Sequence, residues 1–293
     1  MLTEETRATT PLVTNATASE LYEKKTHILN QLKSYERVLV AFSGGIDSTL
    51  LAALAKEALG EKALAVTADS PSIPAAELID AKHLAQEIGI KHLIIRTSEL
   101  DDPNYVANPA NRCYFCKKEL AAKLTDLAKE LGGYMVVDGT NAEDLLGHRP
   151  GAAALSEEGV RRPLADADLT KLEVRSLAKH LGLSNYDKPS MPCLSSRVAY
   201  GETITPERLL RIERAENLIR SLTGVRELRV RDHGSIARIE VGPKERKLFF
   251  DEGLLDQISN ALQDLGFQHI ALDTSGYRSG SMNNSAAVRN RKQ

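Results

Sequence analysis

The sequence predicts an α/β fold in which helices cover both faces of a parallel sheet, followed by a smaller α+β domain. Between residues 38 and 181, short apolar runs typical of buried strands alternate with helix-period segments, which is the pattern of β-α-β units. The run VLVAFSGGIDS, residues 38–48, passes from a strand pattern through two glycines into a helix. Two prolines near residues 187–192 indicate a linker, and beyond it the pattern changes.

The predicted elements follow from local periodicity and from the residues that end each segment. In the first domain, short apolar or β-branched runs predict strands at 38–42, 63–68, 92–97 and 135–141. Amphipathic or apolar-periodic stretches, two of them ended by glycine, predict helices at 47–59, 75–88, 117–131 and 171–181. In the second domain we expect a helix at 206–222, a hairpin of strands 226–231 and 236–241 around an Asp-His-Gly turn, a helix at 251–265 and a strand at 269–272.

Length and composition bound the class of protein. The chain has 293 residues, 42% hydrophobic and 27% charged, which is typical of a globular protein with a sizeable core. We expect a flexible N-terminal segment, a nucleotide domain, a substrate-binding domain and a flexible tail at 1–19, 20–190, 191–284 and 285–293. The net charge of −2 argues against a nucleic-acid partner, and no apolar run or export signal suggests a membrane partner. We therefore expect a cytoplasmic protein, and we also expect it to form a homo-oligomer.

The turn after the first strand has the features of a phosphate site. Ser43, Gly44 and Gly45 precede a helix whose first turn contains Asp47 and Ser48. Backbone N–H groups and the helix dipole favour an anion there, and glycines allow the backbone to approach it closely. The turn lacks the Lys-Ser/Thr ending of a Walker A loop and is not a dinucleotide GxGxxG loop. Asp69 and Asp138 also fall at the carboxyl ends of predicted strands, where ligands bind in such sheets.

The segment SGGIDS resembles the PP-loop of the ATP pyrophosphatase superfamily, whose fold is related to the adenine nucleotide α-hydrolases. The resemblance implies that ATP is cleaved between its α and β phosphates. Beside the phosphates, the Asp47 carboxylate would repel ATP unless a cation bridged them, so Asp47 implies Mg²⁺. Asp144, in the acidic segment 138–151, is a second candidate metal ligand. Lys171 could neutralise pyrophosphate. Taken singly, Asp47 would also fit a common helix-start aspartate, Asp144 would more often lie in a solvated turn, and Lys171 would more often be an exposed helix lysine.

Three cysteines are the second chemical signal. Cys113 and Cys116 form a C-x-x-C pair, and Cys193 follows much later. The spacing alone leaves several interpretations open: a redox dithiol, a zinc site completed by a histidine, or three ligands of a 4Fe-4S cluster that leaves one iron open. The candidate histidines are His83, His92 and His148.

Three further segments resemble the LarE family of sulfur transferases in nickel-pincer nucleotide biosynthesis. They are PCLSSR (192–197), RVRDHGSIARIEV (229–241) and GYRSGSMN (276–283). The resemblance implies adenylation of a carboxylate of pyridinium-3,5-biscarboxylic acid mononucleotide, followed by its conversion to a thiocarboxylate. It implies that Ser196, Arg197, Arg229 and Arg231 bind this substrate, since guanidinium groups suit phosphate and carboxylate. Glu216 and Glu240 resemble acidic residues that hold a metal in the family. Without the resemblance, the arginines would be expected on a solvated strand face.

The family's best-known pattern has one cysteine, matching Cys193, which donates its own sulfur. This chain also has Cys113 and Cys116, which resemble the cluster-binding cysteines of a second branch of the family and of PP-loop tRNA thiolases. We therefore expect a 4Fe-4S cluster that delivers sulfur from sulfide or another sulfur donor, with Lys117 as an assisting cation. The alternatives are sacrificial transfer from Cys193, a tRNA thiolase, an amidating synthetase and a non-enzymatic adenylate-binding module.

Overall fold

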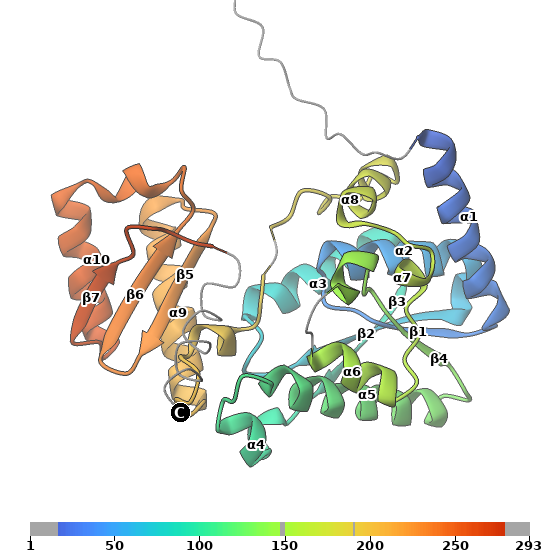
Figure 1. Cartoon of the computed structure of the whole chain (residues 1–293), viewed down its shortest axis with the longest axis horizontal. Helices are drawn as coiled ribbons and strands as arrows, with labels where there is room; N and C mark the ends of the chain where they lie inside the picture. The colour runs from blue at the N-terminus through green and yellow to red at the C-terminus, as the bar shows by residue number, and fades with distance from the viewer. Residues whose placement is uncertain (1–16, 147–149, 190, 279–293) are drawn as a thin grey trace, which may run out of the picture.

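The computed structural model describes residues 17–146, 150–189 and 191–278. They form two sheets, each with its own helices (Figure 1). The larger sheet has four parallel strands in the order β3-β2-β1-β4. Its strands are β1 (Val38–Ala41), β2 (Ala63–Asp69), β3 (Lys91–Arg96) and β4 (Met135–Asp138). The predicted parallel sheet is thus confirmed.

Helices pack on both faces of this sheet, as the alternation of side chains along β1 requires. Val38 and Val40 face one layer, and Leu39 between them faces the other. The first layer contains α1 (Ala18–Ser34), α2 (Ile46–Leu59), α3 (Ala75–Ile88), α7 (Pro163–Asp166) and α8 (Lys171–His180). The second contains α5 (Arg112–Glu130) and α6 (Pro150–Glu157), with the short α4 (Pro103–Val106) preceding α5 (Figure 1).

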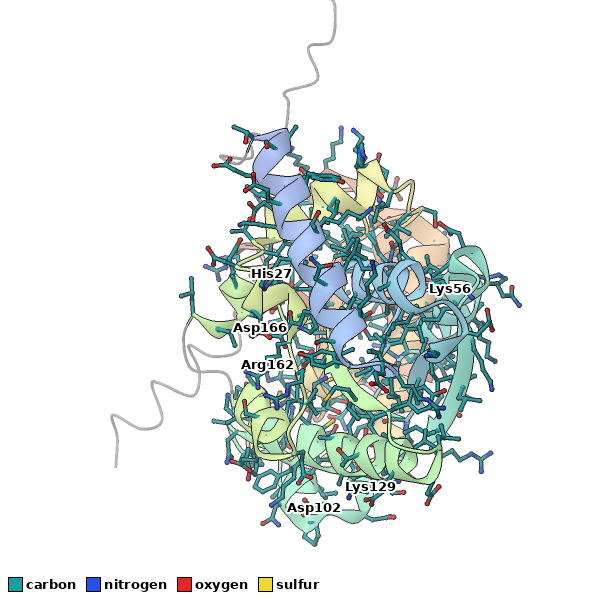
Figure 2. All side chains as sticks on the ribbon, turned by 90° about the vertical axis from the view of Figure 1, so that its right-hand side faces the viewer. His27, Lys56, Asp102, Lys129, Arg162 and Asp166 are labelled. Atoms are coloured by element: carbon teal, nitrogen blue, oxygen red, sulfur yellow. The ribbon has the colours of Figure 1, made fainter. Side chains whose placement is uncertain are left out.

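The helix α1 is an element that the sequence analysis did not predict. It begins at a capping box between Thr17 and Glu20, a signal that was present in the sequence. The predicted flexible segment 1–19 therefore overlaps the first two residues of α1, and residues 1–16 lie outside the described part. Ile28 and Leu32 pack into the core, and Gln31 donates a hydrogen bond to Asp166 at 2.7 Å. Figure 2 shows Asp166 beside α1.

The smaller sheet has the order β5-β6-β7, with β5 (Leu228–His233) antiparallel to β6 (Ile236–Val241) and β7 (His269–Leu272) parallel to β6. The helices α9 (Pro206–Thr223) and α10 (Glu252–Asp264) cover it through a separate apolar core. The hairpin is as predicted, but β5 starts and ends two residues later than expected. Asp232 and His233 therefore belong to the strand, and the turn is formed by residues 234–235.

The chain between the two sheets packs against the first domain. The Leu194 N–H donates to the Ser72 carbonyl at 2.7 Å, and the Asn108 side chain donates to the Ala199 carbonyl at 2.7 Å. Val198 forms a parallel bridge with Asp232 of β5. Residues 194–199 thus contact both the larger, first domain and the small sheet. Within the described residues, no helix is long and apolar enough to cross a membrane.

The ion pairs of Asp232 in β5 with two arginines of α9 connect this helix to the small sheet, and their contribution to stability can be tested. Its carboxylate is fully buried and accepts from Arg208 at 2.8 Å and from Arg211 at 2.5 Å. Replacing it by alanine leaves two cations facing an empty site, so Asp232→Ala should lower the free energy of unfolding by about 3 kcal/mol. Urea unfolding measures this, with the exposed Asp126→Ala of α5 as control. Equal stability of the two variants would contradict this account.

Candidate active site

The turn after β1 folds around the hydroxyl of Ser48. The Ser43 N–H donates to Ser48 Oγ at 3.2 Å, and Ser48 Oγ donates to the Gly45 carbonyl at 3.0 Å. Gly44 has φ +70°, and a Cβ there would lie 3.2 Å from Ala81 of α3. Gly44 therefore meets a steric need, and the turn ends at the N-terminus of α2, as an anion site requires.

The loop after β4 packs directly against this turn. A Cβ on Gly139 would lie 2.7 Å from the Ser48 backbone nitrogen, so only glycine fits without displacing the backbone. Asn141 Nδ2 donates to Asp47 Oδ1 at 2.8 Å. In the strand order β3-β2-β1-β4, the chain passes from β1 through β2 to β3 on one side and then places β4 on the other side of β1. The topological switch point therefore lies between β1 and β4, and ligands bind at such points in open α/β sheets. The sequence analysis singled out neither Gly139 nor Asn141.

Two carboxylates and one lysine lie beside the turn. Asp144 forms an ion pair with Lys171 Nζ at 3.1 Å. Burial raises the pKa of the Asp47 carboxyl, the hydrogen bond from Asn141 partly offsets this, and the nearby Asp144 raises the pKa further. The structure thus brings Asp47, Asp144 and Lys171 together, and their oxygen donors have the chemistry that Mg²⁺ prefers.

The other two aspartates at strand ends have different surroundings. Asp69 ends β2 and its side chain is exposed. Asp138 accepts from the backbone and the hydroxyl of Thr140, so its carboxylate shapes the loop after β4.

Behind the turn at residues 43–48, the buried Asn185 donates to the Gly44 carbonyl at 3.2 Å and to Thr49 Oγ1 at 3.0 Å. Local sequence patterns do not reveal this link.

The cysteines come from two segments that the packing brings together. Cys113 and Cys116 lie in the first turns of α5, which begins at Arg112 and not near Lys117 as predicted. Cys193 precedes the short turn Leu194–Arg197. Cys116 packs with Leu194 against Tyr105.

Burial, with a smaller contribution from the negative charges of Glu99, Cys193 and Cys113, raises the pKa of the Cys116 thiol to about 12. All three cysteines are free, and they lie within electrostatic reach of one another.

Two buried polar side chains next to the cysteines were missed from the sequence. The Tyr105 hydroxyl and Ser195 Oγ share a hydrogen bond at 2.6 Å, and Cys193 and Cys116 both contribute to raising the pKa of Tyr105, for which burial is the main cause. Glu99 accepts hydrogen bonds from Ser70 and Ser72. Tyr105 and Glu99 lie near the thiols only because of the fold, so no local sequence pattern could have identified them.

No group of three or more His, Cys, Asp or Glu side chains in the described ranges is arranged to hold a metal ion. His92 shares a hydrogen bond with Thr67 at 2.8 Å, and His83 lies in α3; His148 lies outside the described residues. The zinc interpretation therefore gains no support from the described histidines.

Lys117 is exposed, and the aliphatic part of its side chain lies against Gly151 of α6. It follows Cys113 by one helical turn of α5.

The arginines of the small domain are buried, contrary to the solvated strand face that the residues alone suggested. Arg197, Arg229 and Arg231 are 0%, 3% and 5% exposed. Arg231 Nη1 donates to the Ser196 carbonyl at 2.9 Å, and Arg197 Nη1 donates to the Cys193 carbonyl at 3.0 Å. These bonds place the arginines directly behind the segment that contains Cys193.

Glu216 and Glu240 neutralise part of this cationic cluster. Glu216 pairs with Arg197 at 2.9 Å and with Arg220 at 2.9 Å. Although burial raises the pKa of the Glu216 carboxyl, Arg197 and Arg220 hold it below its usual value. Glu240 pairs with Arg231 at 2.7 Å and with Arg238 at 2.8 Å. In this arrangement both glutamates bind guanidinium groups, and their predicted role as metal ligands stays a prediction.

Comparison with known proteins identifies relatives along most of the chain. A family model described as NAD synthase matches residues 21–140. A pyridinium-3,5-bisthiocarboxylic acid mononucleotide synthase of Lactiplantibacillus plantarum is 40% identical over 90% of this chain and 95% of its own length. Uncharacterized proteins of Synechocystis sp. and Methanocaldococcus jannaschii are 48% and 30% identical, over 85% and 89% of this chain and 92% and 98% of their own lengths.

The contact between the loop after β4 and α2 gives a testable prediction. Gly139→Ala forces the loop or the start of α2 to move, so it should cost about 1–3 kcal/mol of stability and weaken ATP binding. Thermal unfolding and calorimetry with ATP measure the two effects. The control is Gly253→Ala in α10, where a Cβ meets nothing closer than 3.4 Å. Unchanged ATP affinity in Gly139→Ala would show that the contact does not shape the site.

The raised pKa of Cys116 predicts slow alkylation of the metal-free protein. Only the thiolate reacts, and a thiol with a pKa of about 12 is almost entirely protonated at pH 8. Iodoacetamide should therefore modify Cys116 at least about a hundredfold more slowly than the same cysteine in an unstructured peptide. The rate should rise about tenfold per pH unit, as followed by peptide mass spectrometry. A rate that levels off near pH 9 would contradict the assigned environment.

Proposed function

The chain belongs to the LarE family of pyridinium-3,5-bisthiocarboxylic acid mononucleotide synthases, and from this membership we propose that it is an ATP-dependent sulfurtransferase acting on that mononucleotide. The observation that carries the proposal is the position of Cys193. Its loop bonds to Ser72 in the nucleotide domain through Leu194, and to the buried arginines through Arg197. A sulfur whose segment contacts both the larger domain and the cluster of buried arginines suits transfer to an activated anionic substrate.

The phosphate loop prepares the carboxylate for substitution. A carboxylate oxygen is a poor leaving group, so attack by sulfur first needs a mixed anhydride with AMP. In the proposed reaction a substrate carboxylate oxygen attacks the α phosphorus of ATP, and pyrophosphate leaves into the turn formed by residues 43–48. Asp47 and Asp144 would hold Mg²⁺, which supplies positive charge at the phosphates. Lys171, paired with Asp144, adds a cation beside the leaving pyrophosphate.

The arginine cluster gives the substrate pocket its positive potential. Burial lowers the pKa of the Arg229 guanidinium, and the neighbouring charge of Arg197 lowers it further. Two buried cations that repel each other are stabilised by a bound anion. The mononucleotide carries a phosphate and two ring carboxylates, and bidentate guanidinium groups suit both kinds of anion. Arg197, Arg229 and Arg231, with Ser196, are therefore proposed to bind it.

The sulfur source is the finer part of the proposal. Cys113, Cys116 and Cys193 offer the thiolates that hold three irons of a 4Fe-4S cluster, although the described side chains do not already form a metal-ligand group. When bound, such a cluster would supply sulfide at its open iron. Lys117 would add positive charge near Cys113. The alternative is direct donation from Cys193, which the same three-cysteine geometry permits.

The experiment follows products and stoichiometry under anaerobic conditions. The protein, reconstituted with iron and sulfide, is incubated with ATP, Mg²⁺, the biscarboxylic mononucleotide and sulfide. We expect AMP, pyrophosphate and more than one thiocarboxylate per chain. Asp47→Asn should reduce AMP release by about a hundredfold, since Asp47 acts on charge at the phosphates. The exposed Asp256→Asn of α10 is the matched control and should keep wild-type rates.

Three outcomes separate the parts of the proposal. ADP and orthophosphate as products would exclude cleavage at the α phosphorus. A single turnover with loss of H₂S from Cys193 would establish the sacrificial route and exclude catalytic delivery by a cluster. Normal repeated turnover after Cys113→Ala or Cys116→Ala would also exclude the three-cysteine site.

A further inference from the structure

Two side chains contact the guanidinium group of Arg229. The ring of Tyr277 lies with its centroid 4.8 Å from Arg229 Cζ, and Met191 Sδ lies 3.9 Å from Nη1. Nη1 also donates to the Leu228 carbonyl at 2.7 Å. Arg229 is buried, so its stacking on an aromatic ring is stronger than it would be in water.

The backbone holds the Tyr277 ring in this position. The Asp273 N–H donates to the Ile239 carbonyl at 2.8 Å, and the Tyr277 N–H donates to the Val241 carbonyl at 2.8 Å. Between them, Gly276 has φ +70°, and a Cβ there would lie 2.6 Å from the Val241 oxygen. The chain can therefore return along β6 and present Tyr277 to Arg229 only with glycine at 276.

We propose that Tyr277 is a positioning residue for substrate binding, whose ring holds the Arg229 guanidinium in the orientation that binds an anionic group of the mononucleotide. The inference rests on the proposed function and adds a residue to it. Stacking uses the face of the guanidinium group and leaves its N–H edges directed sideways, where bidentate bonds to phosphate or carboxylate form. An arginine side chain has many rotamers, so fixing one before binding reduces the entropy lost on binding.

The ring, and not the hydroxyl, carries this role, which makes the proposal specific. Tyr277→Leu removes the aromatic face at similar hydrophobicity, whereas Tyr277→Phe keeps it. Tyr277→Leu should raise KM and Kd for the mononucleotide about tenfold, while Tyr277→Phe should stay within about twofold of wild type. For Tyr277→Leu, kcat at saturating substrate and KM for ATP should not change, because the phosphate loop lies in the other domain.

The measurements are steady-state kinetics with each substrate varied, and calorimetry with the mononucleotide and with ATP separately. Tyr22→Leu, a 70% exposed tyrosine on α1, is the matched control. A second test is Gly276→Ala, which should give the same selective rise in mononucleotide KM by moving Tyr277.

The outcomes distinguish this inference from the function on which it rests. If Arg229→Ala weakens mononucleotide binding but Tyr277→Leu does not, the positioning role is wrong and the substrate site stands. If Tyr277→Phe is as impaired as Tyr277→Leu, the hydroxyl is responsible and the inference is overturned. Equal loss of ATP and mononucleotide affinity in Tyr277→Leu shows a general structural role and also overturns it. Unchanged mononucleotide affinity in Arg229→Ala overturns both the substrate site and the inference.

Discussion

The burial of the Arg197 guanidinium is the constraint on which the arrangement of the site depends. A buried cation needs charged and polar partners, and Arg197 finds them in Glu216 of α9 and in the carbonyls of Pro192 and Cys193. These bonds determine the path of the chain on both sides of Cys193. The same segment then pairs with β5 and contacts the nucleotide domain, so the cysteine lies where the two domains meet.

Electrostatics divides the site into two halves of opposite character. Beside the turn at residues 43–48, the negative charge of Asp144 contributes to raising the pKa of the Asp47 carboxyl, and carboxylate oxygens of this kind suit Mg²⁺. In the small domain, guanidinium groups gather behind the Cys193 loop, and Glu216 and Glu240 offset part of their charge. The thiols lie at the boundary, where burial keeps Cys116 protonated until a metal ion or a base removes its proton. Under the proposed function, this division keeps the two anionic substrates in separate sites.

Local patterns in the sequence were sufficient for most of the fold. The ranges of α3 and β6 match their predictions, since each is a periodic segment with clear ends. The start of α5 was placed too late because its first turn, with Arg112 and the cysteines, lacks an apolar period. The end of β5 was misplaced because Asp232 reads as a turn residue, and only its pairing with Arg208 and Arg211 allows a buried strand aspartate.

The candidate site was predictable only where a motif is contiguous. The turn at residues 43–48 could be found from its glycines and its place between a strand and a helix. The burial of Arg229 and Arg231 could not be predicted, because their charge is balanced by Glu216 and Glu240, and only the fold of the small domain brings these residues together. The contacts of Gly139, Asn141 and Glu99 have no local signal in the sequence, since each joins segments that only the fold brings side by side.

Transfer of an oxygen atom tests the central claim, adenylation of the substrate, most directly. The mononucleotide is labelled with oxygen-18 in its carboxylates, and the AMP released in the presence of ATP, Mg²⁺ and sulfide is analysed by mass spectrometry. Adenylation followed by sulfur attack predicts that AMP carries one labelled oxygen from the carboxylate. Unlabelled AMP, or label in orthophosphate, would contradict the account.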